Sequence, residues 1–276
     1  MTESTEQPLG FEHLPGCLRL SKSANWNQNE ADWRLMLELG HGWGLSLADG
    51  TLAASTLVLP YGKFAWISMV LVLPEHRRKG YASRLLRLAI ADLENRGQTP
   101  ILDATPAGRE VYRQEGFRDT WGFKRFFLQR TVPIDGASGV RPMRDKDWPY
   151  VTNLDVEAFG TSREPLLRAL QKRLPQCALM SEGKGFVLGR DGREARQIGP
   201  LVARDERTAL TLLEHALTVV NPPLYVDVAD HAPALQGWVE ARGFALQRPF
   251  TRMVRGAARA PGNEKAVFLV AGPELG

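Results

Sequence analysis

The sequence predicts a mixed α/β chain with two tandem domains, each built on a central mixed β-sheet flanked by helices. Its 276 residues correspond to one large domain or two of ordinary size. Patterns of strand and helix period alternate along the chain, and the same succession begins again after the Pro-, Gly- and Ser-containing stretch 131–139. We therefore expect a loose polar tail over 1–14, a first domain over 15–131, a linker over 132–139 and a second domain over 140–276.

An internal repeat supports two copies of one fold. The motif G-F-x5-F-x-R spans Gly116–Arg125 and recurs at Gly243–Arg252, 127 residues later. The same offset pairs the basic segment Arg77–Ala82 with Arg204–Ala209 and keeps the apolar positions of the following helix. A constant offset over two separated segments predicts that the second half repeats the topology of the first.

Periodicity and turn residues place the elements of the first half. Strands are expected at 16–20, 43–48, 52–59, 64–73, 100–104, 117–118 and 123–129. Helices are expected from an Asn27–Glu30 capping box to Gly40, over 82–97, and over 105–115. The strand at 64–73 is apolar throughout, a pattern typical of burial on both faces of a sheet.

The second half repeats this alternation. Strands are expected at 140–143, 185–190, 194–202 and 224–228, and helices at 145–159, 165–174, 208–219 and 233–242. Asp191-Gly192 supplies the turn of a second hairpin, as Asp49-Gly50 does in the first half.

Composition excludes several classes of protein. The longest nearly apolar run, Phe64–Pro74, is too short to span a membrane, and residues 1–10 lack the basic start and apolar core of a secretory signal, so we expect a cytoplasmic protein without a membrane partner. The two cysteines, Cys17 and Cys177, form neither a disulfide framework nor a zinc motif, so no metal is expected. A net charge of +4 with both signs interspersed predicts no nucleic-acid partner. Oligomeric state is left open.

The segment Arg77–Ala82 (RRKGYA) joins the apolar strand to an amphipathic helix. Backbone amides at the start of a helix lack intrahelical partners, and with the helix dipole they form a site for anions. Gly80 allows the backbone to approach a phosphate closely, and Arg77, Arg78 and Lys79 add positive charge. The segment therefore predicts a phosphate-binding link, against the alternative of a solvated basic turn.

The pattern V-x-P-x-x-R-x-x-G-x-A at Val72–Ala82 is similar to the signature of the GNAT superfamily of N-acetyltransferases. The stretch Leu102–Phe117, with a Tyr shortly before a Gly-Phe pair, resembles the other half of that signature. The second half, with IGPLVARDE and TRM, resembles the degenerate C-terminal GNAT-like domain of tandem family members.

The resemblance implies that acetyl-CoA lies in a V-shaped split between the long strand and the next parallel strand. Its implied contacts are Leu71, Val72, Leu73, Arg77, Arg78, Lys79, Gly80, Tyr81, Ala82 and Arg109. Tyr112 would protonate the departing thiolate. Asp103 is a candidate for guiding or deprotonating the acceptor ammonium, or else a buried hydrogen-bonded Asp. Trp26 and Asn27 are candidate substrate contacts.

The resemblance thus implies direct acetyl transfer, in a ternary complex without an acyl-enzyme, to a primary amine of a small molecule or peptide. The alternative is a non-catalytic acyl-CoA-binding regulatory module. The acceptor and the length of the acyl group are left open.

The second half should have lost its own cofactor site. At offset 127, Arg207 stands for Gly80, the acids Asp205 and Glu206 stand for two basic residues, and Val239 stands for Tyr112. We expect one acetyl-CoA per chain. The second half would brace the first and wall its acceptor cleft, with Asp227, Asp230 or Trp238 as contributors.

Overall fold

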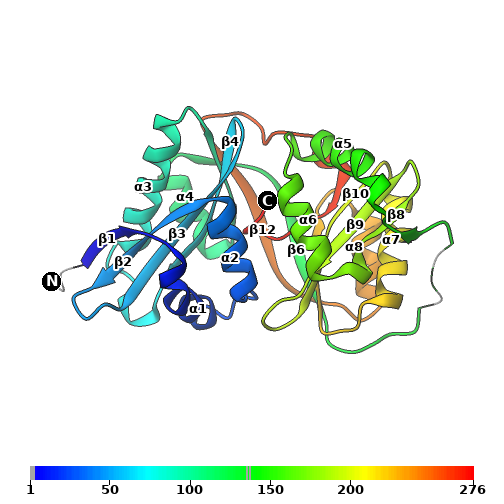
Figure 1. Cartoon of the computed structure of the whole chain (residues 1–276), viewed down its shortest axis with the longest axis horizontal. Helices are drawn as coiled ribbons and strands as arrows, with labels where there is room; N and C mark the ends of the chain where they lie inside the picture. Colours follow the sequence, from blue (N-terminus) through cyan, green and yellow to red (C-terminus); the bar gives the residue numbers. More distant parts are fainter. Residues whose placement is uncertain (1–3, 135, 137) are drawn as a thin grey trace.

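The structure is a computed structural model that describes residues 4–134, 136 and 138–276. Figure 1 shows two lobes side by side, with β6 and β12 running between them. Within the described residues the strands form a continuous 13-stranded sheet in the order β1-β2-β3-β4-β5-β12-β6-β11-β13-β10-β9-β8-β7. The lobes are therefore joined by backbone hydrogen bonds as well as by side chains.

The first half of the chain contributes six strands and four helices among the described residues. They are β1 (Ser4–Pro8), α1 (Leu14–Ser23), α2 (Glu30–Leu39), β2 (His41–Leu47), β3 (Leu52–Tyr61), β4 (Phe64–Val72), α3 (Tyr81–Asn95), β5 (Thr99–Ala104), α4 (Pro106–Gln114) and β6 (Phe117–Leu128). Strand β3 shows how the sheet is covered on both faces. Leu57 and Leu59 pack in the core that includes α1 and α2, whereas Val58 packs with the apolar face of α3. This alternation follows from the two-residue period of a strand.

The second half supplies the rest of the sheet and its helices. They are β7 (Arg141–Pro142), α5 (Trp148–Phe159), α6 (Glu164–Arg173), β8 (Leu179–Ser181), β9 (Gly185–Arg190), β10 (Arg196–Ala203), α7 (Glu206–Val219), β11 (Leu224–Ala229), α8 (Pro233–Ala241), β12 (Ala245–Arg255) and β13 (Val267–Leu269). Short 3-10 turns lie at 11–13, 74–76, 145–147, 175–177 and 264–266.

The two halves exchange strands at the middle of the sheet. Strand β12, from the second half, lies between β5 and β6, and β6 in turn pairs with β11 of the second half. Phe123 and Phe250, which are equivalent in the 127-residue repeat, face each other across the antiparallel β6–β12 pair and stack at 5.0 Å. The predicted repeat therefore meets itself at a local pseudo-twofold axis.

Equivalent arginines of the repeat form equivalent ion pairs across this exchange. Arg125 on β6 donates to both carboxylate oxygens of Asp227 on β11, at 2.7 Å each. Arg252 on β12 donates to both oxygens of Asp103 on β5, at 2.9 and 3.0 Å. All four side chains are buried, so each pair depends on the strand borrowed from the other half.

The structure corrects three expectations at the start of the chain. Within the predicted tail 1–14, β1 pairs with β2 and a 3-10 turn follows at 11–13, while residues 1–3 lie outside the described part. The strand expected at 16–20 is the helix α1. Asn29 rather than Asn27 caps α2, accepting a hydrogen bond from the Asp32 amide in a capping box.

The expected linker, 132–139, contains no helix or strand at its described positions, whereas residues 135 and 137 lie outside them. Cores on the two sides of this segment are not separate, because one apolar cluster includes Leu57 and Leu59 together with Phe159, Leu167 and Leu275. Across the part of the chain that the structure describes, no helix is long and apolar enough to cross a membrane.

Candidate active site

The sheet opens at one point, between β4 and β5. These parallel strands pair from Phe64 with Thr99 as far as Trp66 with Ile101, and beyond these two residues the strands no longer pair with each other. A pocket is lined by residues just beyond that point on both strands, among them Ile67 and Leu102. The separation is therefore the V-shaped split that the sequence signature implied.

A β-bulge shapes β4 beside the split. Ser55 pairs with Leu71 and Leu57 with Ser68, so Met69 and Val70 together oppose a single residue of β3. Met69 takes a left-handed backbone conformation, with φ of 51°, and its carbonyl accepts a hydrogen bond from Ser55 Oγ at 2.8 Å. Such a conformation is costly for a residue with a side chain, and bulges commonly re-aim side chains next to active sites. No pattern in the sequence predicted this bulge.

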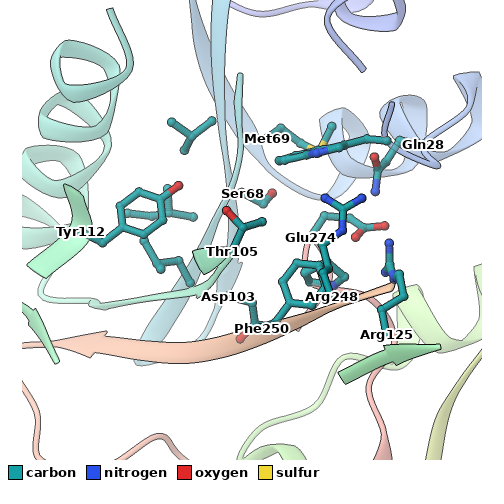
Figure 2. Close-up of a pocket in the computed structure, with 15 residues that line it drawn as sticks. Gln28, Ser68, Met69, Asp103, Thr105, Tyr112, Arg125, Arg248, Phe250 and Glu274 are labelled. Carbon is teal, nitrogen blue, oxygen red and sulfur yellow. The ribbon is translucent and has the colours of Figure 1, made fainter. Parts of the chain in front are cut away.

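The pocket at the split has an empty volume of about 520 Å³. Its lining comes from both halves of the chain: Trp26, Gln28, Ile67, Ser68, Met69, Val70, Leu102, Asp103, Thr105, Tyr112, Arg125, Arg248, Phe250, Pro273 and Glu274. Figure 2 shows Tyr112 at one end of this space and Gln28, Arg125, Arg248 and Glu274 towards the other. A second hollow, between α3 and α4, shares Trp26, Val70, Asp103, Thr105 and Tyr112 with it, so the two are continuous.

Tyr112 lies on α4 with its ring edge against Phe117, at a centroid distance of 6.2 Å. Its hydroxyl is turned towards the pocket (Figure 2) and has no hydrogen-bond partner among the described residues. Burial raises the pKa of Tyr112 to about 12, which keeps the phenol protonated at physiological pH. Helix α4 begins where expected, because Thr105 caps it and Pro106 is its first residue.

Asp103 also lines the pocket, but its carboxylate is already bound. Both oxygens accept hydrogen bonds from Arg252, whose guanidinium lies over the rings of Trp66 and Trp121 at 4.3 and 4.2 Å. Burial raises the pKa of Asp103, and the charge of Arg252 opposes that rise. Of the two roles considered for Asp103, this geometry favours a buried, hydrogen-bonded Asp over a base.

The predicted phosphate link lies on the surface at the start of α3. Gly80 precedes the helix in a left-handed conformation, with φ of 80°, and an added Cβ there would meet no atom within 4 Å. Arg77, Arg78 and Lys79 are wholly or partly exposed, and Ala82 lines the hollow between α3 and α4. The free amides of the first turn of α3 therefore face a surface that is open, basic and continuous with the split.

Arg109 lies on α4, as expected, but its guanidinium is paired with Asp119. Together with Arg113 it lowers the pKa of Asp119 to about 2. Arg109 lines neither hollow. The structure therefore gives Arg109 a partner within the protein, and its contact with the cofactor stays a prediction.

Trp26 lines the pocket, whereas its predicted companion Asn27 does not. The side chain of Asn27 is buried against the hairpin of the second half, donating to the Ala195 carbonyl at 2.9 Å and accepting from the amides of Glu194 and Ala195. A Cβ on Gly192 would lie 2.3 Å from Asn27 Nδ2, so this contact requires glycine. Asn27 positions the loop that carries the pocket residues Trp26 and Gln28.

The second half walls the pocket through residues that the sequence analysis did not select. Phe250 and Arg248 come from β12, and Pro273 and Glu274 come from the segment after β13. Of the residues suggested for this role, Asp227 is bound by Arg125, and neither Asp230 nor Trp238 lines the pocket. The strand exchange and the C-terminal segment bring these positions together, and no local sequence pattern predicts this.

The corresponding split of the second half is filled. Strands β10 and β11 begin as a parallel pair over Arg196–Ile198 and Leu224–Val226, as β4 and β5 do. Strand β13 then enters between them and pairs antiparallel with both. At the start of α7, the carboxylate of Asp205 accepts a hydrogen bond from the Thr208 amide at 2.7 Å. The protein's own atoms thus fill this split and cap this helix.

Comparison with known proteins agrees with this geometry. Residues 11–117 match the model of the Acetyltransferase (GNAT) family, and residues 151–269 match that of an Acetyltransferase (GNAT) domain. The chain is 24% identical over 247 residues to the uncharacterized N-acetyltransferase YitH of Bacillus subtilis (strain 168), with 86% of each chain covered.

Solved structures share the fold over the whole length. A Pyrococcus horikoshii protein classed as an acetyltransferase superposes with a TM-score of 0.84 at 21% identity, covering 99% of this chain and 96% of that one. A GCN5-related N-acetyltransferase from Sphaerobacter thermophilus superposes with a TM-score of 0.66 at 16% identity, covering 96% and 98%. At these identities the likeness concerns the fold.

Proposed function

Because the chain belongs to the GNAT superfamily of acetyltransferases and carries two GNAT domains in tandem, we propose that it transfers an acetyl group from acetyl-CoA directly to a primary amine. The observation that carries the proposal is the open split between β4 and β5, with a bulge on one side and Tyr112 at its end. The amides at the start of α3 and the basic side chains of 77–79 would hold the pyrophosphate.

The residues of the split can divide the chemistry between them. Beyond Trp66 the edge of β4 that faces β5 leaves the ladder, so the backbone groups of Leu71–Leu73 that point away from β3 are available to the pantetheine arm. The Leu73 amide already donates to the Ala53 carbonyl at 2.9 Å, which leaves the amides that are not bonded to β3. One of these amides would stabilise the oxyanion that forms when the amine attacks the thioester. As the new C–N bond forms and the C–S bond breaks, Tyr112 would give its proton to the thiolate. The acceptor ammonium loses one proton to solvent before attack. The nitrogen loses a second proton as the amide forms, and this proton restores the Tyr112 phenol, so one proton is released overall.

The cysteines favour direct transfer over an acyl-enzyme. Burial raises the pKa of Cys17 to about 12 and also raises that of Cys177, so neither thiol is a ready nucleophile. Neither cysteine lines the pocket. We therefore propose a ternary complex of protein, acetyl-CoA and amine.

We further propose one acetyl-CoA per chain, bound in the first half. In the second half β13 fills the split, and Asp205 caps the helix where phosphate would bind. These two observations agree with the replacement of Gly80 by Arg207 and of Tyr112 by Val239 at the repeat offset.

A calorimetric titration with acetyl-CoA, followed by a thiol-release assay against a panel of amines, tests the proposal. We expect a stoichiometry near one per chain and acetyl-CoA cleavage that depends on an amine. Two equivalent sites would contradict the loss of the second. Binding without cleavage for every class of amine would favour the alternative of a non-catalytic acyl-CoA-binding module.

A further inference from the structure

Four charged side chains line the pocket, and they differ in whether the protein already neutralises them. Arg125 donates to both carboxylate oxygens of Asp227, and Asp103 accepts from Arg252 with both of its oxygens. Arg248 forms no ion pair or side-chain hydrogen bond with any described residue. Glu274 is bound through only one of its two oxygens. One cation and one carboxylate oxygen are thus left for a ligand.

Arg248 is held towards the pocket by the backbone. The β6–β12 register shifts between Leu246 and Arg248, and this bulge sets Arg248 directly opposite Arg125. Directly opposed residues of an antiparallel pair project from the same face of the sheet, and both of these line the pocket. Partial burial and the neighbouring charge of Arg125 lower the pKa of Arg248. Two neighbouring guanidiniums repel each other, and a bound anion would reduce this repulsion.

Glu274 is held at the point where β4 and β5 separate. The preceding carbonyl, of Pro273, accepts a hydrogen bond at 3.0 Å from Nε1 of Trp66, the last residue of β4 that pairs with β5. The Glu274 side chain is 2% exposed; Oε1 accepts from Arg190, which also binds Asp32. The other oxygen, Oε2, has no partner among the described residues.

Two uncharged groups in the pocket lack partners as well. Gln28 Oε1 and Ser68 Oγ are buried and without hydrogen bonds in the described part of the chain, although their side chains are only 2% and 7% exposed. An unsatisfied buried polar group is costly, and native proteins rarely keep several in one place. A polar ligand in the pocket would satisfy them.

We propose that the acceptor is an amine that also carries a carboxylate, such as a free amino acid. This inference rests on the proposed acetyl transfer and names the substrate of that site. The acceptor's carboxylate binds Arg248, and its ammonium donates to Glu274 Oε2 near the split. Trp26, Met69 and Phe250 give the rest of the pocket an apolar surface suited to a hydrocarbon side chain.

The charge pattern argues against purely cationic acceptors. A polyamine or an aminosugar has no anionic group to bind Arg248, and its additional ammonium groups would lie near two guanidiniums. A charge-assisted hydrogen bond contributes a factor of about 10 to 100 in affinity. We therefore expect the carboxylate to dominate the choice of acceptor.

Matched acceptors test this directly. Thiol release from acetyl-CoA is measured with leucine, leucinamide and isoamylamine, and with phenylalanine and phenethylamine. We expect kcat/KM about 10- to 100-fold higher for each amino acid than for its counterpart without the carboxylate. Equal values for the paired compounds, or a preference for a polyamine, would overturn the inference while acetyl transfer stood.

Arg248→Gln identifies the residue responsible. It should lower kcat/KM for leucine until most of the advantage of leucine over isoamylamine is lost. The matched control is Arg207→Gln, an exposed arginine of the same half that lies outside the pocket and should leave the preference intact. An unchanged preference in folded Arg248→Gln protein would overturn the assignment of this side chain.

Binding measured without turnover separates the two proposals. Calorimetry with leucine in the presence of CoA should show binding to the wild type and a loss of about 10-fold or more in Arg248→Gln. Such binding without thiol release for any amine would refute acetyl transfer and support the pocket assignment. Thiol release with amines that lack a carboxylate, together with no leucine binding, would support acetyl transfer and refute the pocket assignment.

Discussion

Tyr112 illustrates how a single side chain acquires a role from its surroundings. Its place shortly before Gly116-Phe117 made it a candidate in the sequence, and α4 turns its hydroxyl into the pocket at the end of the split. Among the described residues the hydroxyl has no competing partner, so its proton is available to a leaving group.

Tyr112→Phe should lower kcat by about 10²-fold or more and leave the Kd for acetyl-CoA within about twofold. The phenol loses its proton only above its pKa of about 12, so the wild-type rate should not fall between pH 8 and about pH 10 through loss of this acid. Stopped-time thiol release and calorimetry measure the two quantities. Equal rates for both proteins would mean that water or another group protonates the thiolate.

Gly80 and Gly97 offer a matched pair at the two ends of α3. Both have positive φ, 80° and 65°, and an added Cβ would meet no atom within 4 Å at either position. Replacement by Glu should cost similar backbone strain at each, roughly 1–2 kcal/mol in the free energy of unfolding. Only Gly80→Glu puts a carboxylate at the proposed pyrophosphate site, so it alone should weaken acetyl-CoA binding, by about 10-fold or more. Equal affinities of the two variants for acetyl-CoA in calorimetry would show that the pyrophosphate does not bind at this link.

At the scale of elements, the exchanged strands depend on their buried ion pairs. Asp103→Asn leaves Arg252 buried without its countercharge and should lower the free energy of unfolding by about 3 kcal/mol. Glu157→Gln, which breaks the exposed pair with Arg204, should change it by less than about 1 kcal/mol. Urea titration measures both.

The same variant decides between the two roles considered for Asp103. If the residue only binds Arg252, turnover per folded molecule should fall less than about threefold in Asp103→Asn. A loss of about 10²-fold at unchanged stability would instead make Asp103 the base.

Local sequence patterns predicted most elements but failed at the start of the chain. In α1 the short alternation at Cys17–Leu20 resembles a strand, yet the buried positions Leu14, Cys17, Leu20 and Ser21 follow a helical period and Pro15 stands near the helix start. Asn27 has the residue type of a cap, but tertiary contacts with the second half use its side chain, and Asn29 caps α2 instead. In each case two local patterns competed, and the structure follows the other one: the helical period in α1 and the cap at Asn29 in α2.

The signature around Arg77–Ala82 predicts the donor side of the proposed site because it is local: a strand, a turn and a helix N-terminus adjacent in sequence. The acceptor side could not be found in this way. Arg248 and Glu274 reach the pocket through a strand exchange and a C-terminal segment, and their distance in sequence from the split hides them. The repeat predicted two similar halves, but it did not indicate that the equivalent strands β6 and β12 each pair with strands of the other half.

At the scale of the whole molecule, the exchange joins the two GNAT domains in one continuous sheet. Strand β12 covers the edge of β5 and supplies Arg252 to Asp103, while β6 covers β11 and supplies Arg125 to Asp227. Neither half of the sequence contains a complete sheet or a complete pocket. The second half, though without an open split of its own, is thus required for the site in the first.

We therefore expect that neither fragment 1–134 nor fragment 135–276 unfolds cooperatively by itself, because each would expose unpaired strand edges and unpaired buried charges. Expressed together, the fragments should copurify and recover acetyl-CoA binding, as measured by calorimetry. Phe250→Asp, at the stacked contact with Phe123, should prevent this assembly, whereas Leu246→Asp, at a position 53% exposed on the same strand, should not. A fragment 1–134 that melts cooperatively and turns over acetyl-CoA with the acceptor at the full rate would show that β12 is dispensable, and would assign Arg248 and Glu274 no part in the site.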